Sequence, residues 1–174
     1  MRLQVIALLA AVALVSACSS SGDEAAMTEN TGTQTQAVAP PPPPPAPAGP
    51  VAGSIEQFMQ VAGDRVFFAT DRSDLSDQAQ AALDAQAKWL AAFPAVVVTI
   101  EGHADERGTD DYNLALSARR AAAARDYLIA KGVSASRIQT LAFGESRPVA
   151  TGSNEAAWAQ NRRAVTVLTG GYNS

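Results

Sequence analysis

Apolar residues recur at helical spacing in two long stretches of the chain, and short β-branched or aromatic runs separate these stretches. The first stretch begins at Ser76 or Asp77, either of which can cap a helix, and runs to Phe93, where a proline stops it. The second stretch follows Thr109, a suitable N-cap, and ends at Lys131-Gly132. The residues expected to face the core are Ala79, Leu83, Ala87 and Leu90 in the first helix, and Leu114, Ser117, Ala121, Ala124 and Leu128 in the second.

Shorter apolar runs predict four strands and two short helices. The expected strands are 66–68, 95–101, 138–143 and 163–168, and the expected short helices are 55–61 and 154–160. Strands that alternate with helices favour an α/β two-layer sandwich. The sequence therefore predicts one globular domain over residues 55–169, and Gly170-Gly171 predicts a loose tail over 170–174. Trp89 and Trp158 are interpreted as core residues, because large aromatic side chains are mostly buried.

A dense polar turn over residues 102–109 joins the second strand to the second long helix. Asp105 and Glu106 supply carboxylates there, and Arg119 and Arg120 supply guanidinium groups from the helix. Opposite charges at one turn are suited to a ligand that carries both an ammonium and a carboxylate. Arg120 lies beside the apolar stripe, and Asn113 lies two turns before it on the same side. From spacing alone, the simpler alternative is that Asp105 and Arg120 pair with each other.

Three catalytic or metal-binding alternatives can be weighed against a binding turn. Asp71, Asp105 and Glu106 could supply the two carboxylates of a glycan hydrolase, but acidic turns are common on small domains. A metal site would have to use His103, the only histidine, and the zinc-type ligand spacing is missing. His103 is instead expected to hold the turn through hydrogen bonds. Neither a nucleophile beside a base nor a phosphate-binding glycine loop is visible, so the sequence predicts no enzyme and no cofactor.

The N-terminus has the pattern of an exported lipoprotein. Residues 1–17 resemble a signal peptide, with one arginine, an apolar run too short to span a bilayer, and small residues at the cut. Residues 14–18 (Leu-Val-Ser-Ala-Cys) match a bacterial lipobox, which predicts lipidation of Cys18. Ser19 favours the outer membrane over retention in the inner one. Residues 18–54 are then the lipidated cysteine and a tether rich in Ser, Thr and Pro, and eight of the ten prolines lie in 40–50.

The charge of the chain argues against nucleic-acid binding. The formal net charge is −4, so no basic excess is available to neutralise phosphates. The basic clusters are two arginine pairs, 119–120 and 162–163. Both pairs are interpreted as solvated helix-surface arginines, because runs of charge usually face water.

The polar turn and the helix after it resemble the signature of the OmpA-like peptidoglycan-binding domain family. The matching residues are Gly102 to Thr109 (Gly-His-Ala-Asp-Glu-Arg-Gly-Thr), Tyr112-Asn113, Leu116-Ser117 and Arg120-Ala121. Family members often carry Pro-Glu where this chain has Asp110-Asp111, and either pair can begin a helix. The resemblance covers residues 55–169 and implies a four-stranded mixed sheet with helices packed on one face.

The resemblance also implies a ligand and partners. It places the meso-diaminopimelate of the peptidoglycan stem peptide on Asp105 and Arg120, with Asp71 and Asn113 lining the same groove. The expected partners are peptidoglycan, the outer membrane through the lipid on Cys18, and the periplasmic Tol proteins, TolB above all. The expected role is to tether the outer membrane to the cell wall. A scaffold for other periplasmic proteins is the alternative.

Overall fold

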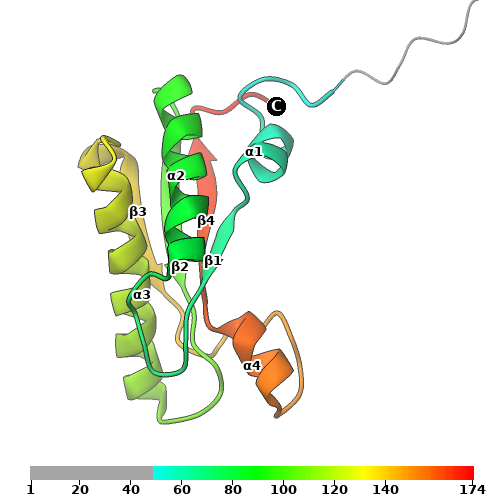
Figure 1. Ribbon diagram of the computed structural model, residues 1–174, viewed down its shortest axis with the longest axis vertical. Coiled ribbons are helices and arrows are strands. Elements are labelled where there is room, and N and C mark those ends of the chain that lie inside the picture. The colour runs from blue at the N-terminus through cyan, green and yellow to red at the C-terminus, as the bar shows by residue number, and fades with distance from the viewer. Residues whose placement is uncertain (1–48) are drawn as a thin grey trace, which may run out of the picture. The chain divides into compact units, whose positions relative to one another are not determined.

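Four strands form one mixed sheet, and two long helices pack against it (Figure 1). The computed structural model describes residues 49–174. The elements in chain order are α1 (Ile55–Val61), β1 (Arg65–Phe67), α2 (Asp77–Ala92), β2 (Val97–Gly102), α3 (Asp110–Ala130), a 3-10 turn (Ala135–Arg137), β3 (Ile138–Ala142), α4 (Glu155–Asn161) and β4 (Arg163–Gly170). The strand order is β1-β4-β2-β3, with β2 parallel to β3 and β4 antiparallel to both of its neighbours. The predicted α/β sandwich with a four-stranded mixed sheet is confirmed.

The helices begin and end where local chemistry dictates. The side chains of Ser76, Thr109 and Asn154 accept hydrogen bonds from backbone N–H groups in the first turns of α2, α3 and α4. Asp110 and Asp111 lie in the first turn of α3, where negative charge complements the helix dipole. The hydrophobic core lies between the sheet and the helices α2 and α3, and it includes Leu83, Leu90, Val98, Ile100 and Leu128.

A close contact between β2 and α3 fixes the position of the polar turn. A Cβ atom added at Gly102 would lie 1.9 Å from the carbonyl oxygen of Ser117, so only glycine fits there. Ser117 and Ala121 are both fully buried at this contact. Small residues therefore let α3 approach the end of β2, next to the turn that joins the two elements.

Three sequence-based expectations differ from the structure. Leu114 is 50% exposed, and Leu116 takes its place in the buried stripe of α3. Trp89 is a core residue, but Trp158 is only half-buried. The expected loose tail is tied to the domain: Gly170 belongs to β4, and the backbone N–H of Asn173 donates to the carbonyl of Gly53.

The signal peptide, Cys18 and the tether up to residue 48 lie outside the described residues. In the part of the chain that the structure describes, none of the helices is long and apolar enough to cross a membrane.

Candidate functional site

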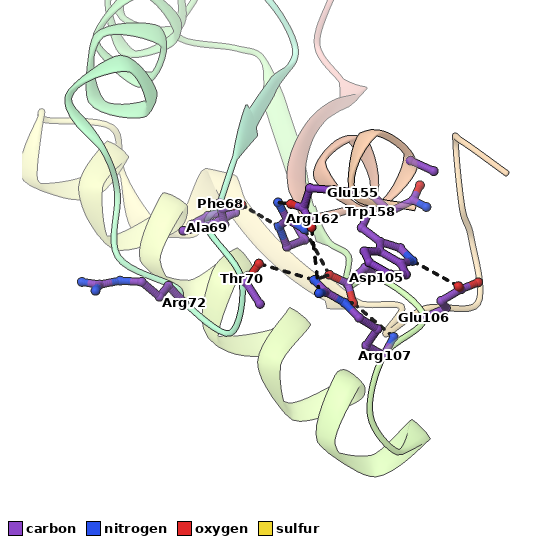
Figure 2. Close-up of polar contacts among 12 residues, drawn as sticks. Phe68, Ala69, Thr70, Arg72, Asp105, Glu106, Arg107, Glu155, Trp158 and Arg162 are labelled. Carbon is purple, nitrogen blue, oxygen red and sulfur yellow. Dashed lines mark hydrogen bonds and ion pairs between the residues drawn. The ribbon is translucent and has the colours of Figure 1, made fainter. Parts of the chain in front are cut away.

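Three segments far apart in the sequence meet beside the end of β2. They are the loop after β1 (residues 68–74), the polar turn, which begins at residue 103 because Gly102 belongs to β2, and the junction of α4 with β4. Arginine side chains join them, because Arg120 and Arg162 each donate hydrogen bonds to the loop after β1. Figure 2 shows this cluster, with Asp105 near its centre.

Asp105 is the main acceptor of the cluster and is already paired. The residue is 7% exposed. Its carboxylate accepts three hydrogen bonds from Arg107: backbone N to Oδ1 at 3.1 Å, Nε to Oδ1 at 3.1 Å, and Nη2 to Oδ2 at 2.7 Å. Arg162 Nη1 lies 3.3 Å from Oδ2. Burial acts to raise the pKa of Asp105, but the hydrogen bonds and charge of Arg107, together with Arg162, hold the pKa below its ordinary value. Asp105 is therefore ionised at neutral pH.

Arg107 and Trp158 form the outer side of the cluster. The guanidinium carbon of Arg107 lies 4.2 Å from the centroid of the Trp158 ring, a cation–π contact. Trp158 Nε1 donates to Glu106 at 3.1 Å, and Arg107 Nη2 lies 3.4 Å from Thr70 Oγ1 (Figure 2). The Arg107 side chain is 37% exposed, so it is the accessible member of the group that holds Asp105.

Arg162 is the buried member of that group. Its Nη2 donates to Glu155 Oε1 at 2.7 Å, and its Nε donates to the carbonyl of Phe68 at 3.1 Å. One guanidinium thus links α4, the loop after β1 and Asp105 of the polar turn. Each of its three nitrogens thus donates to a different segment, and one of them, Nη1, contacts the carboxylate of Asp105.

Arg120 is fully buried and donates only to backbone carbonyls. Its Nε bonds to Arg72 O at 2.9 Å, its Nη1 to His103 O at 2.9 Å, and its Nη2 to Ala69 O at 3.2 Å. Burial lowers the pKa of Arg120 to about 10, although Asp105 and Asp71 act to raise it. Within residues 49–174, no carboxylate lies within ion-pair distance of this guanidinium. Arg120 is thus a buried cation without a direct counter-ion, held between the loop after β1 and the polar turn.

The other two predicted site residues have different surroundings. Asp71 is exposed, and it lies in the loop between the two carbonyls, Ala69 and Arg72, that accept from Arg120. Its φ of 54° is uncommon for a residue other than glycine. Asn113 is buried, and its Nδ2 donates to Glu145 Oε2. The structure therefore brings Asp71, Asp105 and Arg120 to one loop contact, whereas Asn113 joins α3 to the turn after β3.

Several details of the sequence interpretation are wrong. Asp105 and Arg120 do not pair directly. Of the two arginine pairs assigned to the surface, only Arg119 is exposed, and the others are buried: Arg120, Arg162 and Arg163. His103 does not hold the turn through its ring, because neither ring nitrogen has a hydrogen-bond partner within the described residues.

The described part of the chain has no group of three His, Cys, Asp or Glu side chains placed to hold a metal ion.

Sequence reasoning did not identify Arg107 and Arg162 as the partners of Asp105. Arg107 belongs to the Gly102–Thr109 motif that carries the family resemblance, so the motif could have indicated that this side chain takes part in the site. For Arg162, the signal was its position between the end of a helix and an apolar strand, where a side chain has little access to water.

The fold and the loop cluster define an OmpA-like domain, and the chain belongs to the OmpA family: residues 67–162 match the model of that family. Several relatives of this chain are named peptidoglycan-associated lipoproteins. The one from Rhizobium meliloti (strain 1021) is 56% identical over 118 residues, which cover 68% of this chain and 67% of the relative. The one from Pseudomonas putida is 44% identical over 163 residues, which cover 90% and 91%.

Solved structures agree with this placement. The crystal structure of the peptidoglycan-associated lipoprotein from Burkholderia pseudomallei is 42% identical, with a TM-score of 0.59, and the match covers 61% of this chain and 90% of that one. The C-terminal domain of Helicobacter pylori MotB has a TM-score of 0.58 at 19% identity, which shows a shared fold alone.

Proposed function

We propose that this chain is a lipoprotein of the outer membrane that binds peptidoglycan non-covalently through meso-diaminopimelate of the stem peptide. Its role would be to tether the outer membrane to the cell wall as part of the Tol–Pal system. The names of its relatives support the association with peptidoglycan. The single observation that supports the ligand class is the arrangement of Asp105 and Arg120, which offers opposite charges on the two sides of one loop contact.

The free side-chain end of diaminopimelate carries an ammonium and a carboxylate, and the two protein charges suit them. A guanidinium has five N–H donors, and Arg120 uses three of them on carbonyls, so two remain for a ligand carboxylate. A buried cation without a counter-ion is unfavourable, and an arriving carboxylate would relieve that cost. Since the loop carrying Asp71 lies against Arg120, ligand entry requires this loop to move.

The ligand ammonium would bind Asp105 in competition with Arg107. Both oxygens of Asp105 already accept from Arg107, whose side chain is partly exposed and is able to turn away. Arg162 would remain in place, because it is buried and bonded to two other segments. Asp105 would therefore exchange its charge-assisted hydrogen bonds from Arg107 for one from the ligand ammonium. A carboxylate next to that ammonium would bind Arg120, so the site favours ligands that carry both groups.

The test is co-sedimentation of the full chain with purified sacculi. Asp105→Asn keeps the shape of the side chain and removes its charge, so we expect binding to weaken by at least about tenfold, since charge-assisted hydrogen bonds contribute about 1.5–3 kcal/mol each. Asp126→Asn is the control, because it makes the same charge change on an exposed part of α3. Free meso-diaminopimelate should compete for the wild type. Equal sedimentation of both variants would refute the assignment of Asp105.

The same incubation distinguishes a binder from an enzyme. Release of soluble wall fragments into the supernatant would indicate hydrolysis, with Asp71, Asp105 and Glu106 as the carboxylates to test. A protein that only binds the wall sediments with intact sacculi and leaves the supernatant free of muropeptides.

The lipid anchor rests on the lipobox that ends at Cys18. Three acyl chains on one cysteine would hold the chain stably in a bilayer, whereas one chain binds only marginally. We expect Cys18→Ser to leave the protein unprocessed or soluble when cells are fractionated. If this variant partitioned with outer membranes as the wild type does, Cys18 would not be the anchor.

The proposed Tol partners, TolB in particular, are expected to compete with the wall for an overlapping surface. Adding purified TolB to the co-sedimentation assay tests this: TolB should release the chain from sacculi in proportion to its concentration.

A further inference from the structure

The sheet has one strand edge that lacks the usual protection against pairing. The order β1-β4-β2-β3 leaves β1 and β3 with a neighbour on one side only (Figure 1). β1 has three residues and carries the exposed Arg65, beside Asp64. β3 has five residues, Ile-Gln-Thr-Leu-Ala, with neither charge nor proline. Natural edge strands are usually short, charged or interrupted, so β3 is the edge more open to another strand.

Main-chain groups of β3 point toward this free edge. The backbone N–H of Phe143 donates to Gly102 O, which places Leu141 and Phe143 in the hydrogen-bonded register with β2. Because successive residues of a strand direct their N–H and C=O groups to opposite edges, those of Thr140 and Ala142 point away from β2. Thr140 and Leu141 are exposed, so solvent reaches this edge.

A groove lies where the free edge meets the start of α3. Its volume is about 500 Å³, and it is lined by Asp110, Asp111, Leu114, Ala142, Phe143, Gly144, Glu145 and Ser146. Three of these residues carry carboxylates, and none is a lysine or arginine. Asn113 holds the Glu145 carboxylate, and Leu114, half exposed, supplies an apolar wall. The groove thus combines apolar surface with three carboxylates, and one cation lies beside it: the Arg147 guanidinium, 3.9 Å from the Phe143 ring centroid.

We infer that this edge groove, formed by β3 and the start of α3, binds an extended basic segment of a partner protein as an additional strand. The main chain of the segment would pair with Thr140 and Ala142, and a lysine or arginine of the segment would enter the groove between Asp111 and Glu145. Such strand addition takes affinity from main-chain hydrogen bonds and specificity from side-chain pockets. Neither Asp105 nor Arg120 lines this groove, and its link to the predicted diaminopimelate site is the hydrogen bond from Asn113 to Glu145.

A second copy of this chain does not supply the required charge. β3 itself carries no basic residue, and the guanidinium of Arg137, directly before it, donates to the carbonyls of Leu90, Phe93 and Val96. Pairing of β3 with the β3 of another copy would therefore leave both acidic grooves unfilled. Charge complementarity favours a basic segment from a different protein.

The test uses two fluorescein-labelled peptides, one with alternating lysine and valine and one with alternating glutamate and valine, added to the full chain in mild detergent. We expect saturable anisotropy for the lysine peptide only. The double variant Asp110→Asn/Asp111→Asn should weaken its binding about fivefold, since solvent-exposed charge pairs contribute modestly. Asp126→Asn, with a carboxylate outside the groove, should have no effect.

Thr140→Pro tests the main-chain pairing. It removes an N–H that points to the free edge, where proline is tolerated, so it should abolish binding while sedimentation on sacculi is retained. If this variant does not fold, hydrogen–deuterium exchange decides instead: the lysine peptide should slow exchange at Thr140 and Ala142. Equal binding of both peptides, no binding, or exchange unchanged at β3 would overturn the inference. So would a dimer of the free chain that excludes the peptide, because a second copy would then occupy the edge.

Discussion

Replacing Arg120 by methionine is expected to lower the free energy of unfolding by about 3 kcal/mol. Three carbonyls lose their donor, one of them in a buried hydrogen bond and two in part-buried ones. Each unsatisfied buried acceptor costs about 1–3 kcal/mol, and the relief of a buried charge offsets part of the loss. The carbonyls belong to Ala69, Arg72 and His103, so the loop after β1 and the polar turn would lose their common attachment. We also expect sacculus binding to be lost, because that loop carries Asp71.

Arg119→Met is the matched control, since it removes the same charge one residue away on the exposed side of α3. Its effect on stability should be within about 0.5 kcal/mol, as for most surface substitutions. Urea unfolding of the two variants, followed by circular dichroism, provides the comparison. Similar unfolding midpoints would mean that Arg120 does not hold the loops together. Arg120→Lys separates charge from shape, because lysine keeps the charge but cannot reach three carbonyls with a planar fork.

The ends of the helices were predictable because the residues that determine them lie within a few positions of each end. Ser76 and Thr109 cap their helices through bonds to residues three positions later. A proline and a glycine end the same two helices. The misplaced Leu114 has a local cause as well: Asn113 and Arg120 occupy the buried stripe of α3, and a search for apolar periodicity does not select polar residues. Apolar spacing therefore misplaced the first member of the stripe, whereas Ser117, Ala121, Ala124 and Leu128 are buried as predicted.

The interior of the site was not predictable, because its contacts connect distant segments. Arg120 bonds to residues 48 and 51 positions earlier, and Arg162 bonds to a carbonyl 94 positions earlier. Their positions in the sequence, Arg120 beside an apolar stripe and Arg162 before an apolar strand, indicate limited access to water but do not identify the distant carbonyls that they contact. The resemblance to a family supplied Asp105 and Arg120 as site residues, but it did not show that Arg107 already occupies the Asp105 carboxylate.

His103 is expected to make the stability of the domain depend on pH between about 6.5 and about 4. Its side chain is 2% exposed and stacks on Phe143, with ring centroids 5.4 Å apart. Burial, followed by the positive charges of Arg163 and Arg147, lowers the pKa of His103 from 6.5 to about 4. Glu101 Oε2, at 3.8 Å from Nε2, would favour a proton, but the burial of the ring outweighs it.

The direction of this pH dependence follows from proton binding to His103 in the unfolded and folded states. The unfolded chain takes up a proton at His103 near pH 6.5, and the folded domain does so only near pH 4. The stabilisation is thus complete above about pH 6.5 and is lost as the pH falls toward 4, with a total of about 3 kcal/mol. Below that range the carboxyl of Asp105, whose pKa is also lowered, adds a further loss as it becomes protonated.

A variant comparison isolates this contribution because the chain has a single histidine. His103→Phe keeps an aromatic ring beside Phe143 and removes the titrating group. The difference in unfolding free energy between wild type and variant, measured in urea from pH 7 to pH 4, should change by about 3 kcal/mol. Proton NMR of the folded wild type should find the ring titrating near pH 4. Two results would contradict this prediction: a His103 ring that titrates near pH 6.5, and a difference in unfolding free energy that stays constant from pH 7 to pH 4. Together they would mean that water solvates both ring nitrogens in the folded domain.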